Sequence, residues 1–302
     1  MLETTLPGMM PDETEATAGA PPSVPISVAL VLANFPQKQI PAFKYFLLLL
    51  NRLQRTFEFA FYDPPPDEPL TAALRSKKPV DPGSVRRHLL PFGASLKAIA
   101  DETINRVDLA RAFPSQIIVI SQATLSNYHY LIRQKHVTLL ALGEWERSMA
   151  PPSAAEFVQL VVLRAAYSAT EKGAWETIHL GTKSCVFDYT RNLQDTRMMT
   201  LVGLGVCNEC RQALEHDGFT QAPNEIAHVA ERSWLGKRSD PGTPANIMAR
   251  FGYDLYLTRG FTSTLGERFK QLLEEDAAKE FVKLLFLIAG TGLLVWFGLK
   301  NP

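Results

Sequence analysis

Residues 26–62 read ISVALVLANFPQKQIPAFKYFLLLLNRLQRTFEFAFY, and this stretch sets the fold class. Its first eight residues, 26–33, form an apolar run rich in β-branched side chains, which predicts a buried strand. Pro41 is suited to the first turn of a helix, which we expect to reach about Arg55. Phenylalanine at every second position of residues 56–62 predicts another strand. The resulting order of strand, helix and strand is typical of a parallel sheet.

The same alternation continues along the chain. We expect a loop or extended stretch at 63–91, then a helix at 94–112 and a strand at 116–121. A short helix at 127–133 and a strand at 137–143 should follow. Ser153 and Glu156 form the S-x-x-E pattern of a capping box, which predicts a helix to about Ser168. That helix is apolar on most faces, so we expect it to pack in the core. The sequence therefore predicts an α/β fold with a mixed, partly parallel sheet and packed helices.

Composition excludes several classes of protein. The chain has 302 residues, 46% of them hydrophobic and 21% charged, as in globular proteins. Lys plus Arg and Asp plus Glu both number 31, so the chain lacks the excess of positive charge that drives binding to nucleic acid. Residues 1–25 are rich in Pro, Thr and Ala, with neither a basic nor an apolar segment, and predict a disordered leader that is not a signal peptide.

The C-terminal residues 281–299, FVKLLFLIAGTGLLVWFGL, carry one charge in 19 residues. As a helix they would extend about 28 Å, close to the thickness of a hydrocarbon core of about 30 Å. They predict a single transmembrane anchor, although a helix buried in the core or in a partner is the alternative. More basic residues precede the segment than follow it, so we expect the N-terminal body to be cytoplasmic. Membrane lipid is accordingly an expected partner.

The cysteines predict a metal site. All three lie between positions 185 and 210, in the pattern H-x5-C-x21-C-x2-C, and such clustering fits reduced thiols in the cytosol. Zn²⁺ prefers thiolate and imidazole ligands in a tetrahedron, and C-x2-C supplies two thiolates from one turn. The predicted ligands of a structural Zn²⁺ are His179, Cys185, Cys207 and Cys210. His216 or Asp188 remains an alternative fourth ligand, and a redox or incidental thiol pair is the alternative to a metal.

Charged residues lie between the cysteines, at Asp188, Arg191, Asp195 and Arg197. They could bind a ligand. We expect them instead to form salt bridges and the hydrogen bonds that orient metal-binding side chains.

At these positions the chain resembles the archaemetzincin family of zinc peptidases. In that family an HExxHxxGxxH motif ends in a His that is followed by Cys, then by Cys-Val-Met and later by C-x-x-C. His179 matches the last His, Cys185 the Cys-Val step, and Cys207 with Cys210 the final pair. The resemblance implies a metzincin-like fold and zinc bound at these residues.

The catalytic motif of the family is missing. Its two other histidines would fall at Ala169 and Gly173, its general base at Thr170 and its Gly at Glu176, and Leu180 replaces its first structural cysteine. Without two more imidazoles and a carboxylate there is no site to activate water. The resemblance therefore implies a domain without peptidase activity.

Together these features predict a membrane-anchored zinc-binding protein with an inactive metzincin-like cytosolic domain, acting as a scaffold or effector with a protein partner encoded nearby. One alternative is a metal-dependent hydrolase or peptidase using Asp188, Asp195 or Glu156. Another is a defence effector that disrupts membranes through the C-terminal segment. We expect the chain to divide into a leader (1–25), an α/β subdomain (26–150), a helical zinc-binding subdomain (151–260), an amphipathic connecting helix (261–280) and the anchor (281–299).

Overall fold

The computed structural model describes residues 24–256, with gaps, and residues 265, 266 and 269. The gaps are 77, 110–111, 144, 146–149, 171–178, 181–182, 190–194, 198–199 and 201–204, and the side chains of 179, 180 and 189 are also outside the description. The predicted leader, connecting helix and anchor lie almost wholly outside the described residues. Within the described part, no helix is both long and apolar enough to cross a membrane.

A five-stranded sheet forms the centre of the molecule, in the order β2-β1-β3-β5-β4. Its strands are β1 (Ile26–Ala33), β2 (Phe57–Phe61), β3 (Gln116–Ser121), β4 (Leu131–Gln134) and β5 (Val137–Ala141). β2, β1, β3 and β5 run parallel, and β4 pairs with β5 in the antiparallel direction at one edge. The predicted mixed, partly parallel sheet is confirmed.

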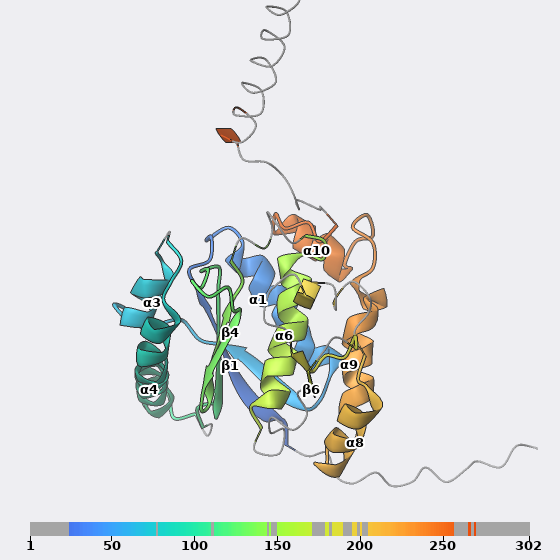
Figure 1. Cartoon of the computed structure of the whole chain (residues 1–302), viewed down its shortest axis with the longest axis horizontal. Coiled ribbons are helices and arrows are strands. Elements are labelled where there is room, and N and C mark those ends of the chain that lie inside the picture. The colour runs from blue at the N-terminus through green and yellow to red at the C-terminus, as the bar shows by residue number, and fades with distance from the viewer. Residues whose placement is uncertain are drawn as a thin grey trace, which may run out of the picture.

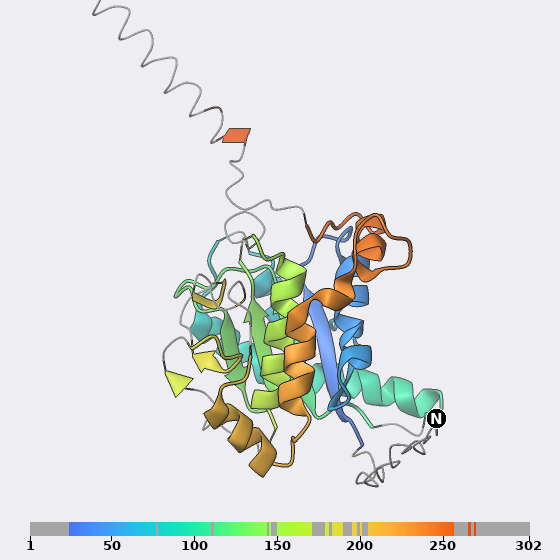
Figure 2. The ribbon, with the colours of Figure 1, turned by 90° about the vertical axis from the view of Figure 1, so that its right-hand side faces the viewer.

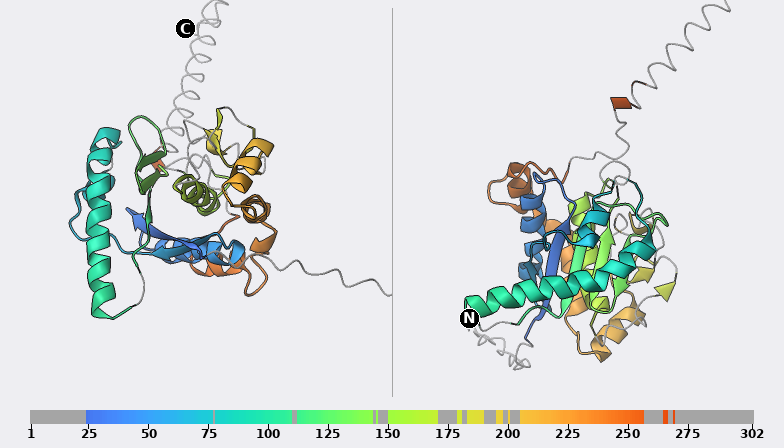
Figure 3. Two further views of the ribbon diagram at one scale, coloured as in Figure 1. Left: turned by 90° about the horizontal axis from the view of Figure 1, so that it is seen from below. Right: turned by 90° about the vertical axis from the view of Figure 1, so that its left-hand side faces the viewer.

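Helices cover both faces of this sheet (Figure 1). The helices on one face are α3 (Pro69–Leu74) and α4 (Pro82–Arg106). On the other face lie α1 (Ile40–Leu48), α2 (Leu50–Leu53), α6 (Ala154–Ser168) and α9 (Ala222–Glu231), with α8 (Asn208–His216) and α10 (Pro244–Arg250) at its ends. Figure 3 shows α4 along one side of the sheet and α6 on the other. The architecture is a three-layer α/β/α sandwich.

β1 shows why the strands read as continuous apolar runs. Side chains alternate across a strand, and Ala29 and Val31 enter the core under α4 while Val28 and Leu30 enter the core under α6. All four side chains are fully buried. Both faces of the sheet are therefore covered at β1, and these four positions leave no place for the alternating polar residues of a half-exposed strand.

α6 is the central helix of its layer, as predicted. All 15 of its residues are buried, and it lies beside α9 (Figure 2). Its start is the expected capping box: the backbone N–H of Ser153 donates to Glu156 Oε2 at 2.9 Å, and that of Glu156 donates to Ser153 Oγ at 3.3 Å. The indole of Trp145 stacks on Phe157 with centroids 3.8 Å apart. The orientation of α6 is thus fixed at its first turn.

The loop predicted for residues 63–91 is wrong at two places. α3 lies within it, and α4 begins at Pro82 and not near residue 94. Asp81 caps α4, with its Oδ2 accepting the N–H of Ser84 at 2.7 Å, and Pro82 occupies the first turn, where a missing N–H costs nothing. α4 also accommodates Pro91 in its interior. Here proline marks the start of a helix and not a loop.

The helix predicted for residues 127–133 is also wrong. Leu131–Gln134 form β4, and Lys135 and His136 connect it to β5. Lys135 takes a left-handed conformation, with φ of 48°, which closes this short hairpin. No Gly or Asn marks the turn, so the usual sequence signal of a hairpin is absent.

Two side-chain amides close the outer edge of β2. Gln54 Nε2 donates to the carbonyl of Phe57 at 2.7 Å, and the N–H of Phe57 donates to Gln54 Oε1 at 2.8 Å. Asn51 does the same for Phe59, at 2.8 Å and 2.7 Å. The backbone groups of β2 that point away from β1 at these two residues are therefore already hydrogen-bonded.

Candidate metal centre

A short parallel bridge brings Cys185 beside the chain that leads into α8. Cys185 pairs with Gly205, the N–H of Val186 donates to the carbonyl of Gly205 at 2.9 Å, and the N–H of Gly205 donates to that of Ser184 at 3.1 Å. Gly205 stands two residues before Cys207. The bridge therefore fixes the approach of two segments that are 20 residues apart in the sequence.

α8 supplies the other two thiols from its first turn. Cys207 is its N-cap residue, and Cys210 follows three residues later. The side chains of the N-cap and N3 residues face one another, as the capping box illustrates, so a C-x2-C sequence here directs both thiols to one side. The partial positive charge of a helix N-terminus favours thiolates at this place.

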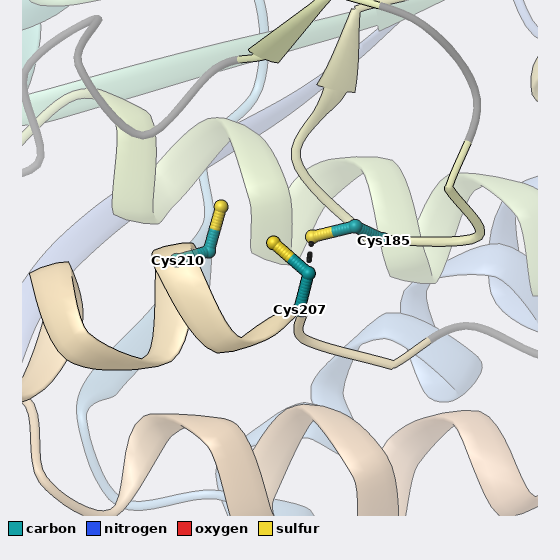
Figure 4. Close-up of side chains that lie close together, drawn as sticks. All are labelled: Cys185, Cys207 and Cys210. Carbon is teal, nitrogen blue, oxygen red and sulfur yellow. Dashed lines mark hydrogen bonds between the residues drawn. The ribbon is translucent and has the colours of Figure 1, made fainter.

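The three sulfur atoms converge (Figure 4). The Sγ atoms of Cys185, Cys207 and Cys210 all lie within 4.8 Å of one another. In a tetrahedral zinc site with Zn–S bonds near 2.3 Å, the sulfurs are about 3.8 Å apart, so a small contraction would complete such a site. The backbone N–H of Cys207 also donates to Cys185 Sγ at 3.4 Å. Three convergent sulfurs form a donor set that could hold a metal ion with a preference for thiolate ligands.

Crowding of the thiols changes their acidity. A hydrogen bond with Cys185, followed by burial and the charge of Cys185, raises the pKa of the Cys210 thiol far above its ordinary value. A divalent cation has the opposite effect, because thiols bind metals only after losing their protons. The cluster therefore has an arrangement that a cation would stabilise.

Asp188 holds the turn that carries Cys185. Its side chain is fully buried, and its Oδ2 accepts the backbone N–H groups of Lys183 at 2.7 Å and of Cys185 at 3.2 Å. Ser184, between these two donors, has a φ of 60°. This is the orienting role expected for the charged residues between the cysteines, exerted through the backbone of a candidate ligand.

An ion pair that the sequence did not suggest links the Cys185 turn to α8. Lys183 Nζ lies 3.2 Å from Glu209 Oε2, and the hydrogen bond with Glu209 raises the pKa of Lys183. Both side chains are exposed, so the pair contributes little to stability. Glu209 stands between the two cysteines of C-x2-C, which is the only signal in the sequence that places it at the site.

The predicted fourth ligand is located only by its backbone. His179 and Leu180 form β6, which runs parallel to β7 (Asp188–Tyr189) and sets His179 opposite Asp188. The side chain of His179 lies outside the described part, so its role stays a prediction. His216, the alternative, ends α8 with its side chain 89% exposed and its Nδ1 3.3 Å from Asp217 Oδ1. Among the described residues, neither His216 nor Asp188 joins the sulfur group.

The other charged residues named from the sequence have separate positions. Asp195 is exposed, Arg197 Nε donates to the carbonyl of Pro151 at 2.9 Å, and Arg191 lies outside the described residues. Glu156 belongs to the capping box of α6, and its Oε1 lies 3.4 Å from Nε of Arg232. Each of Arg197 and Glu156 thus has a structural contact away from the sulfurs.

Comparison with known proteins adds little to this geometry. No family model matches the chain, and no curated protein matches it. Among solved structures, an archaemetzincin from Methanopyrus kandleri is similar over 65% of this chain and 97% of its own, with 10% sequence identity and a TM-score of 0.42. A likeness this low assigns neither family nor activity. The fold and the site define an α/β protein with a three-cysteine group that could hold a metal ion.

Proposed function

We propose that this chain is a zinc-binding protein, anchored in a membrane by residues 281–299, whose folded body acts as a scaffold or effector without peptidase activity. The observation that supports zinc is the convergence of three thiols on the N-terminus of α8. Thiolate-rich sites favour Zn²⁺ over the hard cations that take oxygen ligands. His179 is the proposed fourth ligand.

The role of the metal in this proposal is structural. Four protein ligands would leave no open position for a water molecule, which a catalytic zinc requires. The contacts that join the Cys185 turn to α8 and the chain before it include the bridge to Gly205, hydrogen bonds among the cysteines and one exposed ion pair. A metal ion shared between these segments would add its binding free energy to the attachment between them.

The absence of peptidase activity is supported by the end of α6. An HExxH motif needs two imidazoles one turn apart on a single helix. α6 ends at Ser168 with Ala169 as its C-cap, and the hydroxyl of buried Thr170 donates to the carbonyl of Tyr167 at 2.9 Å. Neither Ala169 nor Thr170 offers an imidazole or a carboxylate. Gly173 lies outside the described residues.

Membrane anchoring is supported by the apolar run of residues 281–299 and by the basic residues that precede it. A scaffold or effector held in this way would act on a protein partner at the membrane surface. A partner encoded by a neighbouring gene is part of this proposal.

Metal analysis of the full chain, purified in detergent from zinc-supplied cells, tests the central claim. We expect one zinc per chain, much less in Cys210→Ser, and an unchanged content in the matched control His216→Ala. Peptide hydrolysis should be absent. Folded protein without bound zinc, or peptide cleavage that a chelator abolishes, would refute the proposal.

A further inference from the structure

The loop that precedes α10 lies at the end of α9 farther from α8 (Figure 1). It begins after a 3₁₀ turn at Ser233–Leu235 and ends at Thr243, the N-cap of α10. Three consecutive exposed residues of this loop, Lys237, Arg238 and Ser239, line a hollow of about 580 Å³ together with Tyr256. The candidate metal centre, at the start of α8, is a separate site.

Hydrogen bonds hold this exposed loop in one shape. Thr243 Oγ1 donates to the carbonyl of Lys237 at 2.7 Å, and Asn246 Nδ2 donates to that of Arg238 at 2.7 Å. The hydroxyl of Tyr256 donates to the carbonyl of Gly236 at 2.6 Å. Because these carbonyls are bound by side chains of the body, the loop would lose little conformational entropy on binding a ligand.

The hollow offers hydrogen-bond donors and positive charge. Lys237 has no ion-pair partner among the residues that the structure describes. Arg238 Nη1 pairs with Asp254, which leaves other guanidinium N–H groups for a ligand. The hydroxyl of Ser239 donates to Asp240 Oδ1 at 2.9 Å, so Asp240 and Asp254 both stand beside the hollow. Ammonium, guanidinium and hydroxyl groups in this combination suit a phosphate group.

The position of the hollow in the chain indicates where that phosphate comes from. Tyr256 is the last residue of the continuously described body, and residues 257–280 connect it to the predicted anchor. Phe251 and Tyr256 are 43% and 54% exposed at this end of the molecule, and Arg250 beside them is exposed. Exposed aromatic and basic side chains are typical of a surface that lies at the headgroup region of a bilayer.

We propose that this hollow binds the phosphate-bearing headgroup of an anionic lipid in the membrane that holds residues 281–299. The inference rests on the proposed anchor and extends it, because it fixes which face of the body meets the bilayer. A basic residue near an anionic bilayer surface gains about fivefold in local binding. Lys237, Arg238 and Arg250 would together hold the body against the membrane, with α8 and its cysteines turned away.

Lysine acetylation of the full chain in vesicles tests this proposal. The chain is inserted into phosphatidylcholine vesicles with and without phosphatidylserine, and acetylation rates are read by mass spectrometry. We expect acetylation of Lys237 to slow at least about fivefold in the anionic vesicles. The exposed Lys97 on α4, on the opposite face of the sheet, should react equally in both. Equal rates at Lys237 in the two kinds of vesicle would overturn the proposal.

Two variants and one soluble probe separate the remaining explanations. Ser239→Glu places a carboxylate in the hollow and should abolish the protection of Lys237, whereas the matched change Ser233→Glu, outside it, should not. If glycerol phosphate protects Lys237 but anionic vesicles do not, the ligand is a soluble phosphate and the membrane proposal is wrong. Resistance to alkaline extraction from the neutral vesicles reports the anchor independently. If alkali extracts the chain from neutral vesicles while Lys237 is still protected from acetylation in anionic vesicles, the anchor is refuted and lipid binding at the hollow is supported.

Discussion

Replacing Asp188 with alanine tests how the turn around Cys185 is built. The change removes an acceptor of two backbone N–H groups, at 2.7 Å from Lys183 and 3.2 Å from Cys185, from a fully buried position. Hydrogen bonds to charged groups contribute about 1.5–3 kcal/mol each, or about 3–6 kcal/mol for the two. Relief from burying a carboxylate returns part of this, so we expect a net destabilisation of about 2–4 kcal/mol.

The same change should weaken metal binding without removing a ligand. Loss of a group that orients a metal ligand typically lowers affinity about 10–100-fold. Competition with a chromophoric chelator measures this, and we expect one zinc per chain to remain when zinc is saturating. Asp188→Asn keeps one neutral acceptor and should fall between alanine and wild type. Asp195→Ala, which changes an exposed carboxylate of the same segment, should bind zinc normally.

Two results would refute this reasoning. An affinity for zinc in Asp188→Ala equal to that of wild type would mean that the carboxylate does not position Cys185. A stoichiometry that falls as far as in a cysteine variant would identify Asp188 as the fourth ligand itself.

The remaining predictions concern the ligands and the anchor. Cys207→Ser should lose zinc and melt about 10–20 °C lower, as a loss of about 5 kcal/mol implies for a body of this size; a melt like that of wild type after loss of zinc would show that the metal is not structural. His179→Ala should lose zinc and match Cys207→Ser in thermal melts if His179 is the fourth ligand, whereas His216→Ala should melt like wild type. Deleting residues 281–302 should give a soluble, folded protein by circular dichroism and gel filtration, and aggregation of the truncated chain alone would assign the segment to the core.

The sequence predicted the elements whose local signals agree with their burial. The strands at Ile26–Ala33 and Gln116–Ser121 were predicted at their observed bounds, because both are apolar on both faces. The capping box of α6 was found because Ser153 and Glu156 hydrogen-bond each other within one helical turn, at a spacing that the sequence shows directly. The starts of α4 and β4 were missed: Pro82 lies within the stretch predicted as a loop, and Lys135 takes a left-handed turn without Gly or Asn.

The candidate site was predictable in part for a similar reason. The C-x2-C spacing alone brings Cys207 and Cys210 together on one helical turn. That Cys185 joins them depends on a bridge to Gly205 and on the buried carboxylate of Asp188, and these are tertiary contacts that no spacing encodes. The division of the chain into subdomains, like the role of His179, stays a prediction.

The amides of Asn51 and Gln54 behave as a substitute neighbour for β2, and this limits how the protein can assemble. A peptide or a second copy that extended the sheet along Phe57 and Phe59 would first have to break four hydrogen bonds. At about 1 kcal/mol each, these amount to roughly a thousandfold in affinity. A partner is therefore expected to bind the side chains on the helices of this protein more readily than to add a strand at the β2 edge.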